Sequence, residues 1–156
     1  ENSDHTRNIV SRAHRDSCIQ ASVSNSFPFL LLEDDAKLAI DFPKDLEVCQ
    51  EADLIYLGLS SYNSGQGNLK VEDYNEDYYR VFNSLAAHAI LIPNIKSAEL
   101  YIKICEEALS DSNWHDKVLA KYSHDKLFLT PKNGPIFYQF DSHTQPVTKI
   151  KAKDFK

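Results

Sequence analysis

Short apolar runs alternate with longer polar stretches along this chain. Apolar runs of strand length predict buried strands at 29–33, 53–59, 78–85, 87–92, 126–130 and 135–140. Apolar positions at helical spacing predict helices at 4–25, 41–51 and 113–122, and a further helix that begins at Pro93 and Asn94. The polar stretch at 60–77 predicts a surface loop. Strands that alternate with helices predict an α/β fold, a three-layer sandwich with a mostly parallel central sheet.

Two of the predicted helices have a recognisable inward face. In the helix at 4–25, the residues at helical spacing are Val10, Ala13, Ser17 and Ala21, with His14 and Cys18 beside them. In the helix after Asn94, they are Ile95, Ala98, Ile102, Cys105 and Leu109. These positions are expected to pack against the sheet.

The first apolar run ends in three carboxylates, because 29–32 is followed directly by Glu33, Asp34 and Asp35. In open α/β sheets, ligands bind beyond the carboxyl ends of the strands. Mn²⁺ and Mg²⁺ prefer oxygen ligands, so the three acids predict a site for one of these ions. Alternate side chains of a strand share a face, which would let Glu33 and Asp35 hold the ion while Asp34 points elsewhere. A solvated acidic turn is the alternative.

Composition limits the classes of function. With 156 residues, 42 % hydrophobic and 26 % charged, the chain fits one domain, here 1–148, followed by a basic tail at 149–156 with four lysines. A net charge of −6 argues against an extended nucleic-acid interface. No apolar run reaches the length of a membrane span, and no signal peptide is evident. We expect a soluble, cytoplasmic protein; a membrane-peripheral location and a viral or phage origin stay open.

Two further features concern cysteine and methionine. Cys18, Cys49 and Cys105 lie far apart in the sequence, match no metal-ligand spacing and are expected to be buried thiols. The chain contains no methionine, which is typical of a piece of a longer or processed polypeptide. An opening βα unit would then be missing.

Several motifs occur in a fixed order along the chain. His14 in the first helix lies nineteen residues ahead of Glu33, which belongs to the Leu-Leu-Glu-Asp-Asp-Ala segment at 31–36. The segments that follow are Asp-Leu-Ile-Tyr-Leu-Gly at 53–58, Ala-His-Ala-Ile-Leu-Ile at 87–92, a short helix headed by Asp116, and Pro135 to Gln139 with Ser142 behind it.

This order resembles glycosyltransferase family 25, the lipooligosaccharide and collagen galactosyltransferase type with a GT-A fold, over about residues 9 to 148. The resemblance implies a metal-dependent enzyme that moves a hexose, galactose or glucose, from a nucleotide sugar, UDP-linked by expectation. The acceptor would be a glycan, a lipooligosaccharide or a protein hydroxyl. The segment at 87–92 departs from the Thr-His-Ala-Tyr pattern of the family.

The resemblance also implies roles for single residues. It makes Asp116 the acceptor-side base, although an acid in the first turn of a helix also interacts with the helix dipole. It makes His143 a third metal ligand beside the acids at 33–35, with an exposed surface histidine as the alternative. The expected substrate contacts are His14, His88, Gln139 and Ser142, and for each of these an ordinary structural role stays open.

Two rival functions remain at this point. The first is a non-catalytic glycosyltransferase-like remnant that binds a glycan or a protein. The second is a metal-dependent phosphohydrolase, suggested weakly because His115 and His124 each precede an aspartate.

Overall fold

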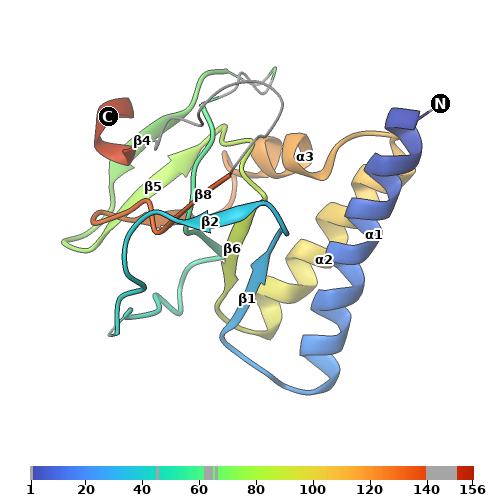
Figure 1. Cartoon of the computed structure of the whole chain (residues 1–156), viewed down its shortest axis with the longest axis horizontal. Helices are drawn as coiled ribbons and strands as arrows, with labels where there is room; N and C mark the ends of the chain where they lie inside the picture. The colour runs from blue at the N-terminus through green and yellow to red at the C-terminus, as the bar shows by residue number, and fades with distance from the viewer. Residues whose placement is uncertain (1, 45, 62–64, 66, 140–150) are drawn as a thin grey trace.

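The structure, a computed structural model, describes residues 2–44, 46–61, 65, 67–139 and 151–156. Helices and strands form a mixed α/β fold, confirming that class (Figure 1). In chain order the elements are α1 (Asn2–Val23), β1 (Phe29–Leu32), β2 (Ala36–Leu38), β3 (Leu54–Tyr56), β4 (Lys70–Asp73), β5 (Tyr78–Phe82), β6 (Ala89–Ile92), α2 (Ile95–Ser110), α3 (His115–Tyr122), β7 (Phe128–Pro131), β8 (Phe137–Gln139) and a 3₁₀ turn η1 (Ala152–Phe155).

The main sheet has six strands in the order β1-β6-β3-β7-β5-β4. In the part of the chain that the structure describes, only β3 and β7 pair in parallel, and the other four pairings of this sheet are antiparallel. The expected mostly parallel sheet is therefore wrong. Strands β3 and β6 are buried at every position, a pattern typical of parallel strands. Here the burial arises because both faces of the sheet are covered at these two strands.

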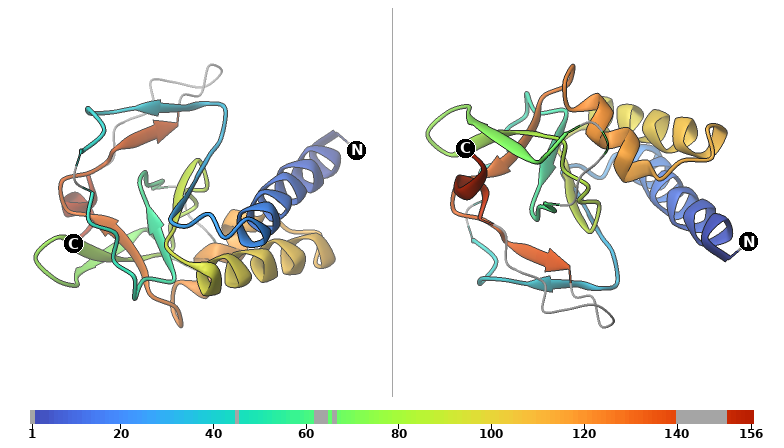
Figure 2. Two further views of the ribbon diagram at one scale, coloured as in Figure 1. Left: turned by 90° about the horizontal axis from the view of Figure 1, so that it is seen from below. Right: turned by 90° about the horizontal axis from the view of Figure 1, so that it is seen from above.

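Different elements cover the two faces of the sheet. Figure 2 shows α1, α2 and α3 together on one side, and the two-stranded ribbon of β2 and β8 on the other. Along β3, Leu54 and Tyr56 belong to the core under the helices, whereas Ile55 and Leu57 belong to the core under the ribbon. The segment 41–51, expected to be a helix, contains no helix in its described residues, and it covers the second core with Leu46 and other side chains.

The helix α1 buries three of the positions expected to face inward, His14, Cys18 and Ala21, together with Ser11. Of the other expected positions, Ala13 is exposed, and Val10 and Ser17 are half-buried. The inward face therefore carries a serine and a histidine towards the interior. Asn25, with φ of 49°, ends the helix in the left-handed conformation, and the Ser26 N–H donates to the Ala21 carbonyl at 3.0 Å.

The helix α2 begins where the sequence predicts. Asn94 is the N-cap, and its side chain accepts a hydrogen bond from the Ser97 N–H at 3.1 Å. Its inward face is rotated from the expected one, because Tyr101 and Ile104 are fully buried while Ile95 is 44 % exposed. The aromatic ring of Tyr101 thus lies in the interface between α1 and α2.

Two smaller expectations are corrected. The strand β4 lies inside the segment expected to be a loop, 60–77. The expected basic tail packs on the protein in its described part, since Ala152 is buried, Phe155 contacts the core and Lys156 pairs with Asp73. The prediction of buried thiols is confirmed for Cys18 and Cys105, whereas Cys49 is a free thiol that is only half-buried. No helix in the described residues is long and apolar enough to span a membrane.

Replacing Gly58 by alanine is expected to destabilise the fold. A Cβ at this position would lie 2.1 Å from His88 Nε2 and 2.7 Å from the Phe137 carbonyl oxygen, so side chain and backbone must both move. We expect a loss of about 1–3 kcal/mol in the free energy of unfolding, as for overpacked cores, measured by urea denaturation. Gly134→Ala is the control, because the nearest atom to its Cβ would be the Pro131 carbonyl oxygen at 3.2 Å. Equal losses for the two variants would contradict this account.

Candidate functional site

A cleft of about 650 Å³ opens between α1, the end of β1 and the beginning of α3. Its polar lining comes from four places in the sequence: α1, the turn after β1, the start of α3 and the end of β8. The polar and aromatic residues that contribute are His14, Ser17, Glu33, Asp34, Asp35, Trp114, His115, Asp116 and Gln139. Side chains that are distant in the sequence therefore face one cavity.

Six of the site residues predicted from the sequence line this cleft: His14, Glu33, Asp34, Asp35, Asp116 and Gln139. His88 lies close by but does not line it. Ser142 and His143 lie outside the described residues. The structure thus brings most of the predicted residues together, although it alters how they relate to one another.

The chain turns directly after Glu33. The Glu33 N–H donates to the His88 carbonyl at 2.9 Å, and the Ala36 N–H donates to the Glu33 carbonyl at 3.1 Å, which closes the turn. Asp34 is exposed and Asp35 is half-buried. The alternation of a strand therefore does not apply to the three acids, and the expectation that Glu33 and Asp35 share a strand face is wrong.

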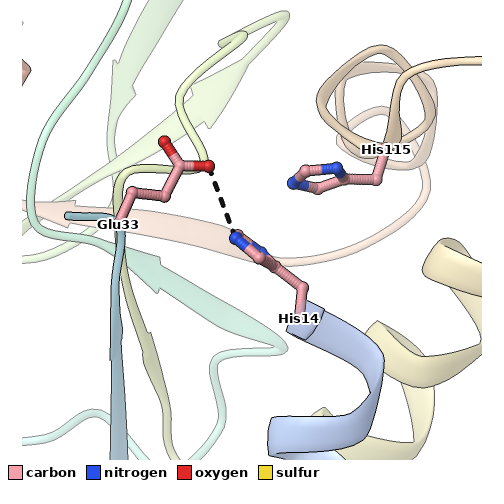
Figure 3. Close-up of side chains that lie close together, drawn as sticks. All are labelled: His14, Glu33 and His115. Atoms are coloured by element: carbon pink, nitrogen blue, oxygen red, sulfur yellow. Dashed lines mark ion pairs between the residues drawn. The ribbon is translucent and has the colours of Figure 1, made fainter. Parts of the chain in front are cut away.

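Glu33 instead lies beside two histidines. His14 Nε2 is 3.4 Å from Glu33 Oε1, and one ligand atom from each of His14, Glu33 and His115 lies within 4.8 Å of the other two. Figure 3 shows the two imidazole rings approaching the carboxylate from separate helices. We refer to these three residues as the His–Glu–His cluster.

Hydrogen bonds hold the Nδ1 atom of each histidine ring, the nitrogen that does not face the cluster. His14 Nδ1 is 2.8 Å from the Tyr101 hydroxyl, and His115 Nδ1 is 3.3 Å from the Ser11 hydroxyl. His115 is only 2 % exposed, and its Nε2 atom has no hydrogen-bond partner in the described part of the protein. Burial, with a smaller contribution from His14, lowers the pKa of His115 to about 3. The ring is therefore neutral at physiological pH.

His115 is the residue whose position the sequence did not reveal. The only signal was the repeated His-Asp pair formed with His124, and the structure separates that pair. His124 Nε2 is 2.8 Å from Asn83 Oδ1, and its ring packs beside Phe82. The true partner of His115 comes from α1, and no local pattern connects α1 with α3.

Asp35 and Gln139 contact each other at the end of the β2–β8 ribbon, where Ala36 pairs with Gln139. Gln139 Nε2 donates to Asp35 Oδ2 at 2.9 Å, which holds the carboxylate from the end of β8. The other oxygen, Asp35 Oδ1, is buried and has no hydrogen-bond partner among the described residues. An anionic oxygen in that position is suited to a cation.

Asp116 is half-buried at the start of α3, in the first turn as predicted. Burial raises the pKa of this carboxyl to about 6, the charge of Glu33 adds to the rise, and hydrogen bonding from the Lys117 N–H at 2.7 Å opposes it. Its carboxylate is therefore a stronger proton acceptor than an exposed aspartate.

His88 lies behind the cleft and is 2 % exposed. Its ring is so close to Gly58 that no side chain fits between them. Burial lowers the pKa of His88, while the charges of Glu33 and Asp35 act in the opposite direction. His88 does not line the cleft, and its ring packs against Gly58 at the strand end.

Comparison of the chain with protein-family models, with curated proteins and with solved structures finds no match.

The neutral state of His115 has a measurable consequence for stability. Because its folded-state pKa lies near 3, the unfolded chain binds more protons between that value and about pH 6.5. The contribution of this residue is fully present above pH 6.5 and is lost as the pH falls towards 3. With a chelator present, we expect His115→Gln to reduce the dependence of unfolding free energy on pH in this window.

Asp116 has the opposite effect, because its raised pKa favours the folded state at lower pH. This effect is present in the wild type and in the His115→Gln variant, so it cancels in the comparison. His124→Gln serves as the control. Proton NMR of the His115 ring should show no titration between pH 7 and 5, and a midpoint near 6 would contradict the assignment.

Proposed function

We propose that this chain is a metal-dependent glycosyltransferase that moves a hexose, galactose or glucose, from a UDP sugar to the hydroxyl of a glycan, lipooligosaccharide or protein. The observation that carries the proposal is that the acidic turn at 33–35 and Asp116 line one cleft, although they are distant in the sequence. A transferase of this kind needs carboxylates near the leaving diphosphate and one near the acceptor.

The size and lining of the cleft support a substrate of this class. Its volume of about 650 Å³ falls in the range usual for small-molecule sites. The lining also includes the apolar side chains of Leu31, Leu85 and Ala87. Apolar walls limit the access of water, which favours transfer to an acceptor over hydrolysis.

The acids at 33–35 offer the oxygen donors that a hard divalent cation prefers. Asp34 is exposed at the cleft, and Asp35 carries the buried oxygen without a partner. Glu33, Asp34 and Asp35 would hold Mn²⁺ or Mg²⁺, which when bound neutralises the charge that develops on the diphosphate. Gln139 would orient Asp35, because its amide already donates to Oδ2.

Asp116 would act on the acceptor. Its carboxylate accepts the proton of the acceptor hydroxyl while the oxygen of that hydroxyl bonds to the anomeric carbon of the hexose. The bond between this carbon and the diphosphate oxygen breaks, and its electron pair leaves with the nucleotide. The hydrogen bond from the Lys117 N–H at 2.7 Å would keep the carboxylate oriented at the helix start.

The first test is binding of the nucleotide. Calorimetry should show that UDP binds in the presence of Mn²⁺ and that a chelator abolishes binding. Asp35→Asn is expected to weaken binding by at least about tenfold, since even outer partners of a metal site have effects of that size. Asp41→Asn is the matched control, because Asp41 is exposed and does not line the cleft. Failure of the wild type to bind UDP at any Mn²⁺ concentration would favour the non-catalytic remnant.

The second test separates binding from chemistry. Asp116→Asn keeps the shape of the side chain but removes its capacity to accept the proton. We expect UDP affinity to remain within about twofold, while the rate of UDP release from UDP-galactose or UDP-glucose with acceptor falls by about 10²–10⁴. Asp125→Asn, which alters the other His-Asp pair, is the control. A rate equal to that of the wild type would show that Asp116 is not the base.

A further inference from the structure

The His–Glu–His cluster contains two imidazoles that the proposed transfer step does not use. Oxygen ligands suit Mg²⁺ and Mn²⁺, whereas imidazole suits zinc, cobalt, nickel and copper ions. The cluster thus differs in chemical class from the acidic turn beside it. It also lines the cleft, so an ion can reach it from solvent.

The spacing of the donor atoms is close to that of a metal site. Ligands about 2.0–2.1 Å from a tetrahedral zinc ion lie roughly 3.4 Å apart. His14 Nε2 and Glu33 Oε1 are 3.4 Å apart already. All three ligand atoms lie within 4.8 Å of one another, so His115 needs only a small side-chain movement to complete the set.

The unpaired nitrogen of His115 is a second, independent observation. The Nε2 atom is buried and has no hydrogen-bond partner in the described structure, although buried polar atoms of proteins are normally paired. Figure 3 shows the ring of His115 directed towards His14 and Glu33. A metal ion in the cluster would satisfy this atom.

The surroundings of the cluster also orient both rings for metal binding. The Tyr101 hydroxyl and the Ser11 hydroxyl contact the Nδ1 atoms of His14 and His115. When each Nδ1–H donates to its hydroxyl, each Nε2 keeps a lone pair directed at the cluster. Metal-binding histidines commonly have their other nitrogen held by an outer partner in this way.

We propose that His14, Glu33 and His115 bind a divalent transition-metal ion, with Zn²⁺ preferred. Three protein ligands beside an open cleft leave a coordination position for water or a substrate oxygen, as in catalytic rather than structural zinc sites. The proposal does not rest on the transferase function, because it uses two histidines that have no part in that reaction.

The experiment is a titration of chelator-treated full-length protein with Co²⁺, which reports coordination through its visible absorption. We expect an absorption band that saturates at one ion per chain and that Zn²⁺ displaces. His115→Ala and His14→Ala should each weaken binding by at least about 100-fold. His124→Ala is the matched control and should bind as the wild type does, because His124 is bonded to Asn83 instead.

Tyr101→Phe tests the orienting contact. It removes only the hydroxyl at His14 Nδ1 and should weaken Zn²⁺ binding about 10–100-fold while the Co²⁺ spectrum keeps its form. Circular dichroism checks that each variant is folded, and His115→Gln replaces any variant that is not. Absence of a saturable Co²⁺ band in the wild type, or equal affinity in the wild type and a folded His115 variant, would overturn the proposal.

The two proposals fail separately. Loss of Co²⁺ binding in the histidine variants while Mn²⁺-dependent UDP binding persists supports the cluster as its own site. If the protein binds Co²⁺ but never binds UDP, only the transferase proposal is contradicted. Glu33 variants are left out of the comparison, because Glu33 belongs both to the acidic turn at 33–35 and to the His–Glu–His cluster.

Discussion

The antiparallel pairing of β1 with β6 determines where the residues of the cleft lie. The register from Phe29 opposite Ile92 to Leu32 opposite Ala89 ends at the hydrogen bond between the Glu33 N–H and the His88 carbonyl. The acidic turn must begin there. Strand β6 leads almost directly into α2, which packs against α1 and α3, so the same pairing fixes the distance from the turn to both helices.

Burial acts in opposite directions on the ionisable groups that gather at this place. It lowers the pKa of His115 and raises that of Asp116, its neighbour in the chain. Near neutral pH, the cleft thus presents the uncharged imidazole of His115 beside carboxylates. The mutual repulsion expected of three adjacent acids is reduced by the turn, which leaves Asp34 exposed and gives Glu33 and Asp35 different partners.

The sequence could predict the elements that depend on local chemistry. The cap at Asn94 and the break between the apolar run and Glu33 are examples, because each follows from the residues at one point of the chain. The direction of strand pairing could not be predicted in this way. Full burial of β3 and β6 is equally compatible with parallel and antiparallel neighbours once both faces of the sheet are covered.

The candidate site shows the same division. Acids at the end of a strand and an aspartate in the first turn of a helix stand at recognisable places, and they line one cleft. The place of His115 beside His14 depends on the approach of α1 to α3. The burial of Ser11, rather than of Val10 or Ala13, lies within the ambiguity of apolar periodicity in a helix with few large apolar residues.

The two donor classes in the cleft follow from the elements that supply them. The helices α1 and α3 contribute imidazoles, and the turn after β1 contributes carboxylates with the amide of Gln139 behind them. Glu33 is the one residue at the boundary, since it belongs to the acidic turn in sequence and to the histidines in space. Because a single carboxylate cannot neutralise two cations fully, ions bound on its two sides would compete for its charge. The metal preferences proposed for the two sites would therefore depend mainly on their other donors: oxygen from Asp34 and Asp35, nitrogen from His14 and His115.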